Sequence, residues 1–363
     1  MALIPITVLT GFLGAGKTTL INTIIKQKDT DENIVILINE FGDISVDSEL
    51  VLNTEEDIYE MNNGCMCCVV RQDIVDMLEA IKKANDEKNM SIDHIIIETS
   101  GLADPGPIVQ VILQSAELQE DFVIDSVITL VDAKNALYQL AHYKESIDQV
   151  AFADTIFITK KDQVDVETYN ALVHELRAIN PYVQLKDLDL KNVKMTDVIG
   201  LDLFDRALTG TEKLVEDLEN MNLDHDDHHH HHDHDHEHCE HCDHDHHDHD
   251  HGDEHHHVHH HHHSSGIDSF SISTTKPLNL EKLNQWTSRL IFTYGNDLMR
   301  YKGVLYIEGI DDQVIFQGVN QSFMTEYGNP WVAGTEKTLL VIIGKDLPKD
   351  KILDSFEKDV ISH

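Results

Sequence analysis

A glycine-rich stretch near the start of the chain has the residue types of a phosphate-binding loop. Gly11-Phe12-Leu13-Gly14-Ala15-Gly16-Lys17-Thr18 matches the pattern G-x-x-x-x-G-K-[ST], and Thr19 follows it. Glycines let backbone N–H groups close around a phosphate at a helix N-terminus. We therefore expect this loop to bind a nucleotide, with Lys17 neutralising the β- and γ-phosphate oxygens and Thr18 coordinating Mg²⁺.

Hydrolysis of a nucleotide needs a second acidic centre, and Glu98 is the candidate. It follows the apolar run 95–97 and precedes Thr-Ser-Gly101. We expect Glu98 to hold Mg²⁺ through water or to orient the attacking water, and the Gly101 N–H to sense the γ-phosphate. Asp47, in the candidate switch loop 40–47, is a further candidate for the Mg²⁺ shell. A carboxylate that only caps a strand is the alternative for Glu98.

The loop that follows a later apolar run predicts which base is bound. Thr159-Lys160-Lys161-Asp162 is a variant of the N-K-x-D guanine signature. Asp162 would accept the N1 and N2 hydrogens of guanine, and the Lys160 stem would lie over the base. Because Thr159 replaces the usual Asn, an amide that braces the loop is lost. We expect a guanine preference that is weaker than usual.

Three thiols stand within four residues and indicate a metal site. Cys65, Cys67 and Cys68 can converge on one soft cation such as Zn²⁺. Three ligands leave one position open, as a transfer site requires, whereas a structural zinc is normally closed by four protein ligands. Glu40 or a histidine could fill that position. Buried small side chains or a redox pair are the alternatives, but neither requires three cysteines so close together.

One segment differs from the rest of the chain in composition. Residues 224–263 contain 23 of the 27 histidines and 13 acidic residues, without any Lys or Arg. Such a segment cannot bury apolar surface, so we expect a solvated tether. Imidazole and thiol groups make it a polydentate chelator that concentrates or stores metal without defining which metal. Its auxiliary metal ligands include His238, Cys239, His241 and Cys242.

These sites must be positioned by regular elements, and the apolar runs predict which ones. Short β-branched runs alternate with helical segments over the first two hundred residues, which is typical of a P-loop α/β domain with a parallel sheet. After the tether, a smaller α+β domain is expected. It should contain helices over 278–291 and 349–360 and strands over 303–308, 314–318 and 338–344. The domain boundaries are then 1–210, 211–266 and 267–363.

The composition indicates which classes of partner and which cellular compartment to expect. The 363 residues carry 27 Lys and Arg against 66 Asp and Glu, a formal net charge of −39. This charge repels nucleic-acid phosphates and anionic lipids, so we expect neither nucleic acid nor a membrane as a partner. No apolar stretch reaches the ~20 residues of a membrane span. The 5 clustered cysteines suit ligation rather than disulfides, which favours a reducing, cytoplasmic location.

Taken together, the motifs resemble those of the CobW family of metallochaperone GTPases. The resemblance rests on residues 11–19, Asn39-Glu-Phe-Gly, Gly64-Cys-Met-Cys-Cys68, Glu98-Thr-Ser-Gly-Leu-Ala-Asp-Pro105, the Thr159 loop, Arg300-Tyr-Lys-Gly303 and Gln317-Gly-Val-Asn320. The histidine-rich insert is similar to that of the zinc-handling branch. The chain departs from the family at Thr159, usually Asn, and at Asn320, often His.

The resemblance implies a GTPase that uses GTP, Mg²⁺ and Zn²⁺ and delivers zinc to a client metalloprotein, with nucleotide state gating metal affinity. It assigns 11–18 and 159–162 to GTP and Cys65, Cys67 and Cys68 to zinc. Related GTPases dimerise across the nucleotide face, so a homodimer is a further expected partner, although no residue decides it. Three alternatives stay open: a cobalt or iron chaperone for a cofactor pathway or hydratase, a zinc storage protein with a regulatory nucleotide site, and an ATP-driven kinase.

Overall fold

The computed structural model describes residues 3–26, 33–38, 58–60, 68–88, 91–181, 183–204 and 266–361. Within these residues the chain builds two β-sheets, which belong to one compact unit. None of the helices in these ranges is long and apolar enough to cross a membrane.

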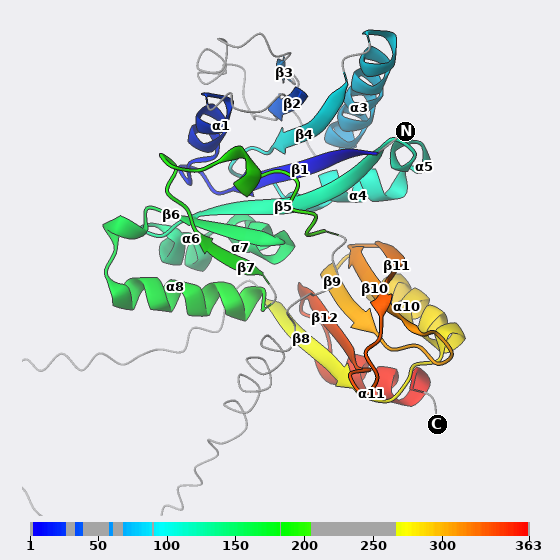
Figure 1. The fold of residues 1–363 in the computed structure, drawn as a ribbon. Helices are drawn as coiled ribbons and strands as arrows, with labels where there is room; N and C mark the ends of the chain where they lie inside the picture. Colours follow the sequence, from blue (N-terminus) through cyan, green and yellow to red (C-terminus); the bar gives the residue numbers. More distant parts are fainter. Residues whose placement is uncertain are drawn as a thin grey trace, which may run out of the picture. The chain divides into compact units, whose positions relative to one another are not determined.

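The first sheet has seven parallel strands in the order β3-β2-β4-β1-β5-β6-β7 (Figure 1). The strands are β1 (Ile4–Gly11), β2 (Asn33–Ile38), β3 (Ile58–Glu60), β4 (Ile92–Glu98), β5 (Phe122–Asp132), β6 (Thr155–Thr159) and β7 (Gln184–Asp187). This confirms the expected parallel α/β architecture. Strands β4, β1 and β5 are adjacent and parallel, so the loops that follow their carboxyl ends lie side by side at one edge of the sheet.

The apolar runs form central strands because both faces of the sheet are covered. Neighbouring residues such as Val8 and Leu9 point into different hydrophobic clusters. One cluster packs under α1 (Lys17–Lys26), and the other packs under several helices on the opposite face. The remaining elements of this domain are α3 (Cys68–Lys88), α4 (Gly106–Gln114), α5 (Ala116–Gln119), α6 (Ala136–His142), α7 (Lys144–Phe152), η1 (Lys161–Gln163), α8 (Val166–Ile179) and η2 (Met195–Asp197).

The second sheet has five antiparallel strands in the order β11-β10-β9-β12-β8. They are β8 (Ile267–Thr274), β9 (Leu298–Leu305), β10 (Asp312–Val319), β11 (Ser322–Pro330) and β12 (Thr338–Lys345). Helices α10 (Leu280–Tyr294) and α11 (Lys349–Asp359) pack on one face, where Trp286 stacks edge-on against Phe356. Residues of the other face, including Val341 and Ile343, join the core of the first domain.

The second sheet differs from the sequence-based expectation in the bounds of one strand and in two additional strands. The strand expected over 303–308 is β9, which begins at Leu298 and ends at Leu305. Arg300 and Lys302 lie among its first five residues, so a search for apolar runs starts too late. Strands β8 and β11 were not anticipated, because β8 alternates polar and apolar residues and β11 is an edge strand with few β-branched residues.

Candidate nucleotide and metal site

The glycine-rich loop lies between the end of β1 and the start of α1. Gly14 and Gly16 have φ values of +79° and +107°, a left-handed region that favours glycine. Lys17 is the first residue of α1, and its Nζ donates to the Gly11 carbonyl oxygen at 2.7 Å. The loop therefore presents the N-terminus of a helix together with a folded-back ammonium group, an arrangement that suits a phosphate.

Glu98 lies beside this loop although it is 80 residues away from Thr18 in sequence. The Thr18 hydroxyl donates to Glu98 Oε1 at 3.2 Å, and the Glu98 side chain is buried. The pairing of β1 with β4 places them together, since Leu9 lies opposite Glu98 in register. A hydroxyl and a carboxylate oxygen form a hard-donor set that suits Mg²⁺, so these two residues fit the magnesium site that the sequence predicts.

The segment 99–105 follows Glu98 and lies against the glycine-rich loop. A Cβ on Gly101 would lie 2.9 Å from the backbone nitrogen of Leu13. Gln149 of α7 donates from Nε2 to the carbonyl oxygens of Gly101 at 3.2 Å and Ala103 at 3.1 Å. The sequence did not single out Gln149, because nothing local relates it to a loop 48 residues earlier. It fixes the loop that is expected to sense the γ-phosphate.

The candidate base-reading loop is braced by residues that the sequence interpretation undervalued. Thr159 Oγ1 donates to the Ala15 carbonyl oxygen at 3.0 Å and approaches that of Val131 at 3.3 Å. The hydroxyl thus takes over a bracing bond to the phosphate loop, although an Asn amide is missing. Lys160, at φ +55°, donates to the Gly14 carbonyl oxygen at 2.9 Å and pairs with buried Asp132 at 2.7 Å.

The last two residues of this loop have different surroundings. Lys161 pairs with Asp187 at 2.5 Å, and its Nζ lies 4.1 Å from the centre of the Tyr169 ring. The Asp187 interaction raises the pKa of Lys161. Asp162 is exposed within η1, where its carboxylate is accessible to a ligand. Asp162 can therefore accept hydrogen bonds from a guanine edge, whereas the Lys161 side chain is held by Asp187.

The expected metal ligands lie largely outside the described residues. This holds for Glu40, Asp47, Cys65 and Cys67, and for the auxiliary ligands His238, Cys239, His241 and Cys242. Cys68 is the first residue of α3, and only its backbone belongs to the described part. Elsewhere in the described ranges, no group of three or more His, Cys, Asp and Glu side chains could hold a metal ion.

Comparison with known proteins adds to this geometry. Residues 5–186 match the family described as "CobW/HypB/UreG, nucleotide-binding domain". The chain belongs to the CobW/HypB/UreG family. Residues 267–359 match the "Cobalamin synthesis protein cobW C-terminal domain", so the resemblance seen in the sequence is confirmed for both domains.

Two bacterial relatives of this CobW/HypB/UreG protein match it over nearly its whole length. It is 28% identical to "Zinc chaperone YjiA" of Escherichia coli, over 97% of this chain and 98% of the relative. It is 29% identical to "Zinc chaperone CobW" of Pseudomonas aeruginosa, over 97% of this chain and 90% of that protein. The crystal structure of Zn(II)-bound YjiA GTPase from E. coli superimposes with a TM-score of 0.69 at 23% identity, covering 99% of each chain. This likeness shows a shared fold.

Near the Gly101 loop, this CobW-type domain buries a carboxyl group with an altered pKa. Burial raises the pKa of Asp148 on α7 to about 6, while Lys144, 3.2 Å away, opposes the shift and the charge of Asp104 adds to it. Asp148 Oδ1 is buried and accepts no hydrogen bond from the described residues. The carboxylate form is therefore disfavoured beside the loop that Gln149 holds.

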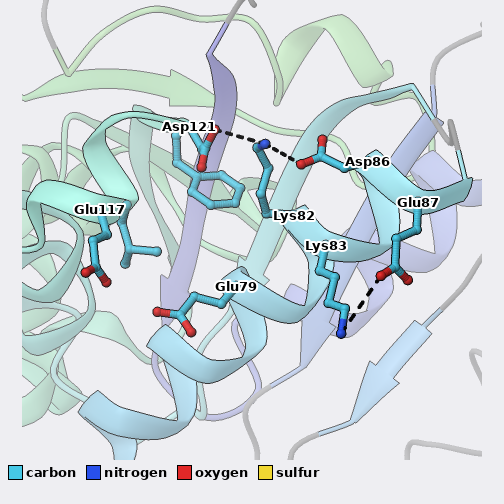
Figure 2. A pocket seen from close by; sticks show the side chains of 9 residues that line it. Glu79, Lys82, Lys83, Asp86, Glu87, Glu117 and Asp121 are labelled. Carbon is cyan, nitrogen blue, oxygen red and sulfur yellow. Dashed lines mark hydrogen bonds and ion pairs between the residues drawn. The ribbon is translucent and has the colours of Figure 1, made fainter.

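A surface pocket of about 510 Å³ lies elsewhere on this domain, against α3, α5 and the beginning of β5 (Figure 2). Lys82 pairs with Asp86 at 2.6 Å and with Asp121 at 3.2 Å, and Lys83 lies 3.9 Å from Glu87. Phe122, the first residue of β5, lines the pocket. The pocket is thus at the amino end of a parallel strand, whereas ligands of such sheets bind beyond the carboxyl ends.

Proposed function

We propose that this chain is a GTP-hydrolysing zinc chaperone. Zinc would bind Cys65, Cys67 and Cys68, with Glu40 as a fourth ligand, and pass to a client metalloprotein. The observation that carries the proposal is the contact between Thr18 and Glu98, because it joins the phosphate loop to the segment 99–105. The names of the bacterial relatives, which are zinc chaperones, support the metal and the activity.

The hydrolytic step follows from the placement of a few side chains. A bound Mg²⁺ would supply electrostatic stabilisation of the charge that develops on the phosphate oxygens. Thr18 and Glu98 would hold it, with Asp47 as a further ligand. Lys17 would exchange its bond with the Gly11 carbonyl for the β- and γ-phosphate oxygens. Asp162 would accept the guanine hydrogens, while Thr159 and Lys160 keep that loop against the phosphate loop.

Nucleotide state can reach the thiols through two packed helices. Segment 99–105 leads directly into α4, which packs against α3, and α3 begins at Cys68. Any movement of the segment on loss of the γ-phosphate would therefore bear on the helix that carries the third thiol. Linkage requires that zinc change nucleotide affinity by the same factor as nucleotide changes zinc affinity. A typical coupling of about 1–3 kcal/mol gives roughly 5- to 150-fold.

The thiol chemistry agrees with a site that both binds and releases zinc. Cys68 is the first residue of the 21-residue helix α3, so the backbone that carries the third thiol belongs to a regular element. Three thiolates with one exchangeable position allow a client ligand to enter before the zinc leaves. The histidine-rich segment would supply metal to this site. Its capacity should fall on acidification, since only neutral imidazole binds metal.

The test is GTP hydrolysis at controlled free Zn²⁺ with the full chain, and with ATP alongside. The variant Cys65→Ser/Cys67→Ser/Cys68→Ser should lose zinc-dependent turnover but keep nucleotide binding. Cys239→Ser/Cys242→Ser, in the histidine-rich segment, is the matched control and should keep zinc-dependent turnover. If the triple variant responds to zinc as the parent does, the thiols are not linked to hydrolysis and the proposal fails.

Zinc storage is the second candidate function, and the 23 histidines of residues 224–263 favour it. A storage protein would hold several metal ions in that segment and hydrolyse GTP at a rate indifferent to zinc. Counting bound zinc in the full chain and in a variant lacking 224–263 separates the two functions. Competition between Zn²⁺, Co²⁺ and Fe²⁺ for the shortened chain tests the alternative cargoes.

Location and assembly are parts of the same proposal. Thiols that must exchange metal need a reducing compartment, so we expect the protein in the cytoplasm. A homodimer across the nucleotide face is the assembly that the family resemblance suggests. Sedimentation with GDP and with a non-hydrolysable GTP analogue tests it, and a monomer in both states would contradict it.

A further inference from the structure

Two basic residues of the second sheet reach beyond their own domain. Arg300 and Lys302 alternate on β9 and point to the face opposite the helices α10 and α11. Arg300 Nη1 donates to the Phe152 carbonyl oxygen at 2.8 Å, and its Nη2 pairs with Asp154. The side chains of this pair are only 6% and 5% exposed. Both arms of the guanidinium therefore end on the segment that joins α7 to β6.

Helix α7 also contacts segment 99–105. Gln149 precedes Phe152 by less than one helical turn and donates to the Gly101 and Ala103 carbonyl oxygens. The Phe152 ring lies where a Cβ on Gly106 would come within 2.6 Å, so it packs against the first residue of α4. Helix α7 thus contacts segment 99–105, the start of α4 and Arg300 within four residues.

Arg300 also contacts Phe204, which lies near the end of the first domain. Phe204 is buried, and the Arg300 guanidinium lies 5.0 Å from its ring centre. Lys302 Nζ donates to the carbonyl oxygens of Leu203 at 2.6 Å and Phe204 at 3.0 Å. Lys302 thus binds the backbone at Leu203 and Phe204, and Arg300 packs over the Phe204 ring.

We propose that Arg300 is a positioning residue that couples segment 99–105, the second sheet and the buried end of the first domain at Phe204. The inference rests on the proposed nucleotide site. A planar guanidinium with two fixed donors and a stacked ring tolerates little displacement of its acceptors. A shift of α7 when the γ-phosphate is lost must therefore move β9 and Phe204, or break these buried bonds. Nucleotide state and the second domain then bias each other reciprocally.

The chain contains its own reporter of this coupling. Its 2 tryptophans, Trp286 and Trp331, both belong to the second domain. Trp331 packs against Val304, which lies on the same face of β9 as Arg300. Tryptophan emission of the full chain, recorded with GDP and with a non-hydrolysable GTP analogue, therefore reads the second domain while the nucleotide occupies the first.

Arg300→Lys keeps the charge but can reach only one of the two acceptors. We expect the emission difference between the two nucleotides to be lost in this variant, together with the parent's ratio of GDP to GTP-analogue dissociation constants. Arg289→Lys is the matched control, because Arg289 pairs with Asp359 in the same domain but is 60% exposed. It should keep both quantities. Gln149→Met cuts the opposite end of the connection and should reproduce the loss with Arg300 intact.

Equilibrium dialysis with radiolabelled GDP separates failure of the inference from failure of the proposed function. A parent chain that binds neither nucleotide overturns the nucleotide site itself. A parent that binds both nucleotides with identical emission, or an Arg300→Lys chain that keeps the full difference and affinity ratio, overturns the coupling. Loss in Arg300→Lys and Gln149→Met with retention in Arg289→Lys supports it.

Discussion

Two polar networks on the same parallel sheet differ in their exposure and in what surrounds them. At the carboxyl ends of β1 and β4, Lys17, Thr18 and Glu98 meet beside a glycine-rich loop. Deeper in the sheet, Thr7 of β1, His94 of β4 and Asp125 of β5 form a second network. The second network is buried, whereas Thr18 of the first is partly exposed. The first network faces a loop that can bind phosphate, whereas the second is enclosed by the protein.

The second network is satisfied by the chain itself. Thr7 Oγ1 donates to Asp125 Oδ2 at 3.0 Å and lies 2.8 Å from His94 Nε2, which must then donate to it. Asp125 also accepts from the Ser126 hydroxyl and from the Asp202 backbone nitrogen. Burial lowers the pKa of His94, against the opposing charge of Asp125. We therefore interpret His94 as a structural residue. It lies inside β4, whereas Glu98 of the same strand lies at the carboxyl end.

The largest effect should come from Glu98→Gln. The substitution keeps the shape but removes the charge that, in the proposed function, would hold Mg²⁺ or orient water, so we expect GTP hydrolysis to fall by about 10²- to 10⁴-fold. The free energy of unfolding should change little. Single-turnover hydrolysis and urea unfolding of the same preparation measure the two quantities. Hydrolysis within a factor of a few of the parent would mean that Glu98 is a strand cap.

Asp125→Ala should show the reverse behaviour. It leaves the Thr7 hydroxyl, the Ser126 hydroxyl and the Asp202 N–H without their acceptor, so we expect the free energy of unfolding to fall by about 3 kcal/mol. Hydrolysis per folded molecule should be unchanged. Urea unfolding combined with active-site titration measures both. A fall in hydrolysis with unchanged stability would show that Asp125 contributes to the nucleotide site rather than to folding alone.

The first network could be predicted from the sequence because its residues belong to local motifs. The glycine pattern places Lys17 and Thr18, and an apolar run that ends in Glu98 places the acid at the carboxyl edge. The family assignment and the parallel sheet expected from alternating runs are confirmed. In each case a few adjacent residues carry the information.

The contacts that the sequence did not reveal all join distant segments. Gln149 and Asp132 look ordinary until the fold brings them to the Gly101 segment and to Lys160. Arg300 and Lys302 interrupt an apolar run, and this is why β9 was expected to start later than it does. Their pairing with Asp154 and the Leu203 and Phe204 carbonyls explains why charged residues occupy a central strand. The packing of segments far apart in the sequence, rather than residue type, determines these partners.

Asp148→Asn tests a buried carboxyl group on α7 that belongs to neither network. The folded pKa of Asp148 is raised from 3.8 to about 6, so the folded state disfavours its charge. Between about pH 4 and 6 the unfolded chain loses this proton first, and stability falls as pH rises. The Asn variant should be more stable than the parent by up to about 3 kcal/mol at pH 8, because a shift of about two pKa units already includes the attraction of Lys144.

Urea unfolding of parent and variant from pH 4 to 8 measures this difference. The difference should shrink as pH falls through 6 and become small near pH 4, where Asp148 is protonated in the folded state and about half protonated in the unfolded chain. Lys144→Met is the control, since it removes only the opposing charge and should raise the Asp148 pKa further. A difference that is constant with pH would show that the titration of Asp148 does not contribute.

The smallest effect should come from Thr159→Val, which tests how the first network is held together. Valine keeps the shape of threonine but removes the donor to the Ala15 and Val131 carbonyl oxygens. One lost hydrogen bond of about 1 kcal/mol predicts roughly five-fold weaker nucleotide binding. GTP and ATP should weaken equally, because Asp162, rather than Thr159, would read the base. Competitive titration of both nucleotides measures the ratio. A selective loss of GTP would assign base recognition to Thr159 itself, and the hydroxyl would then belong to the binding site rather than to its support.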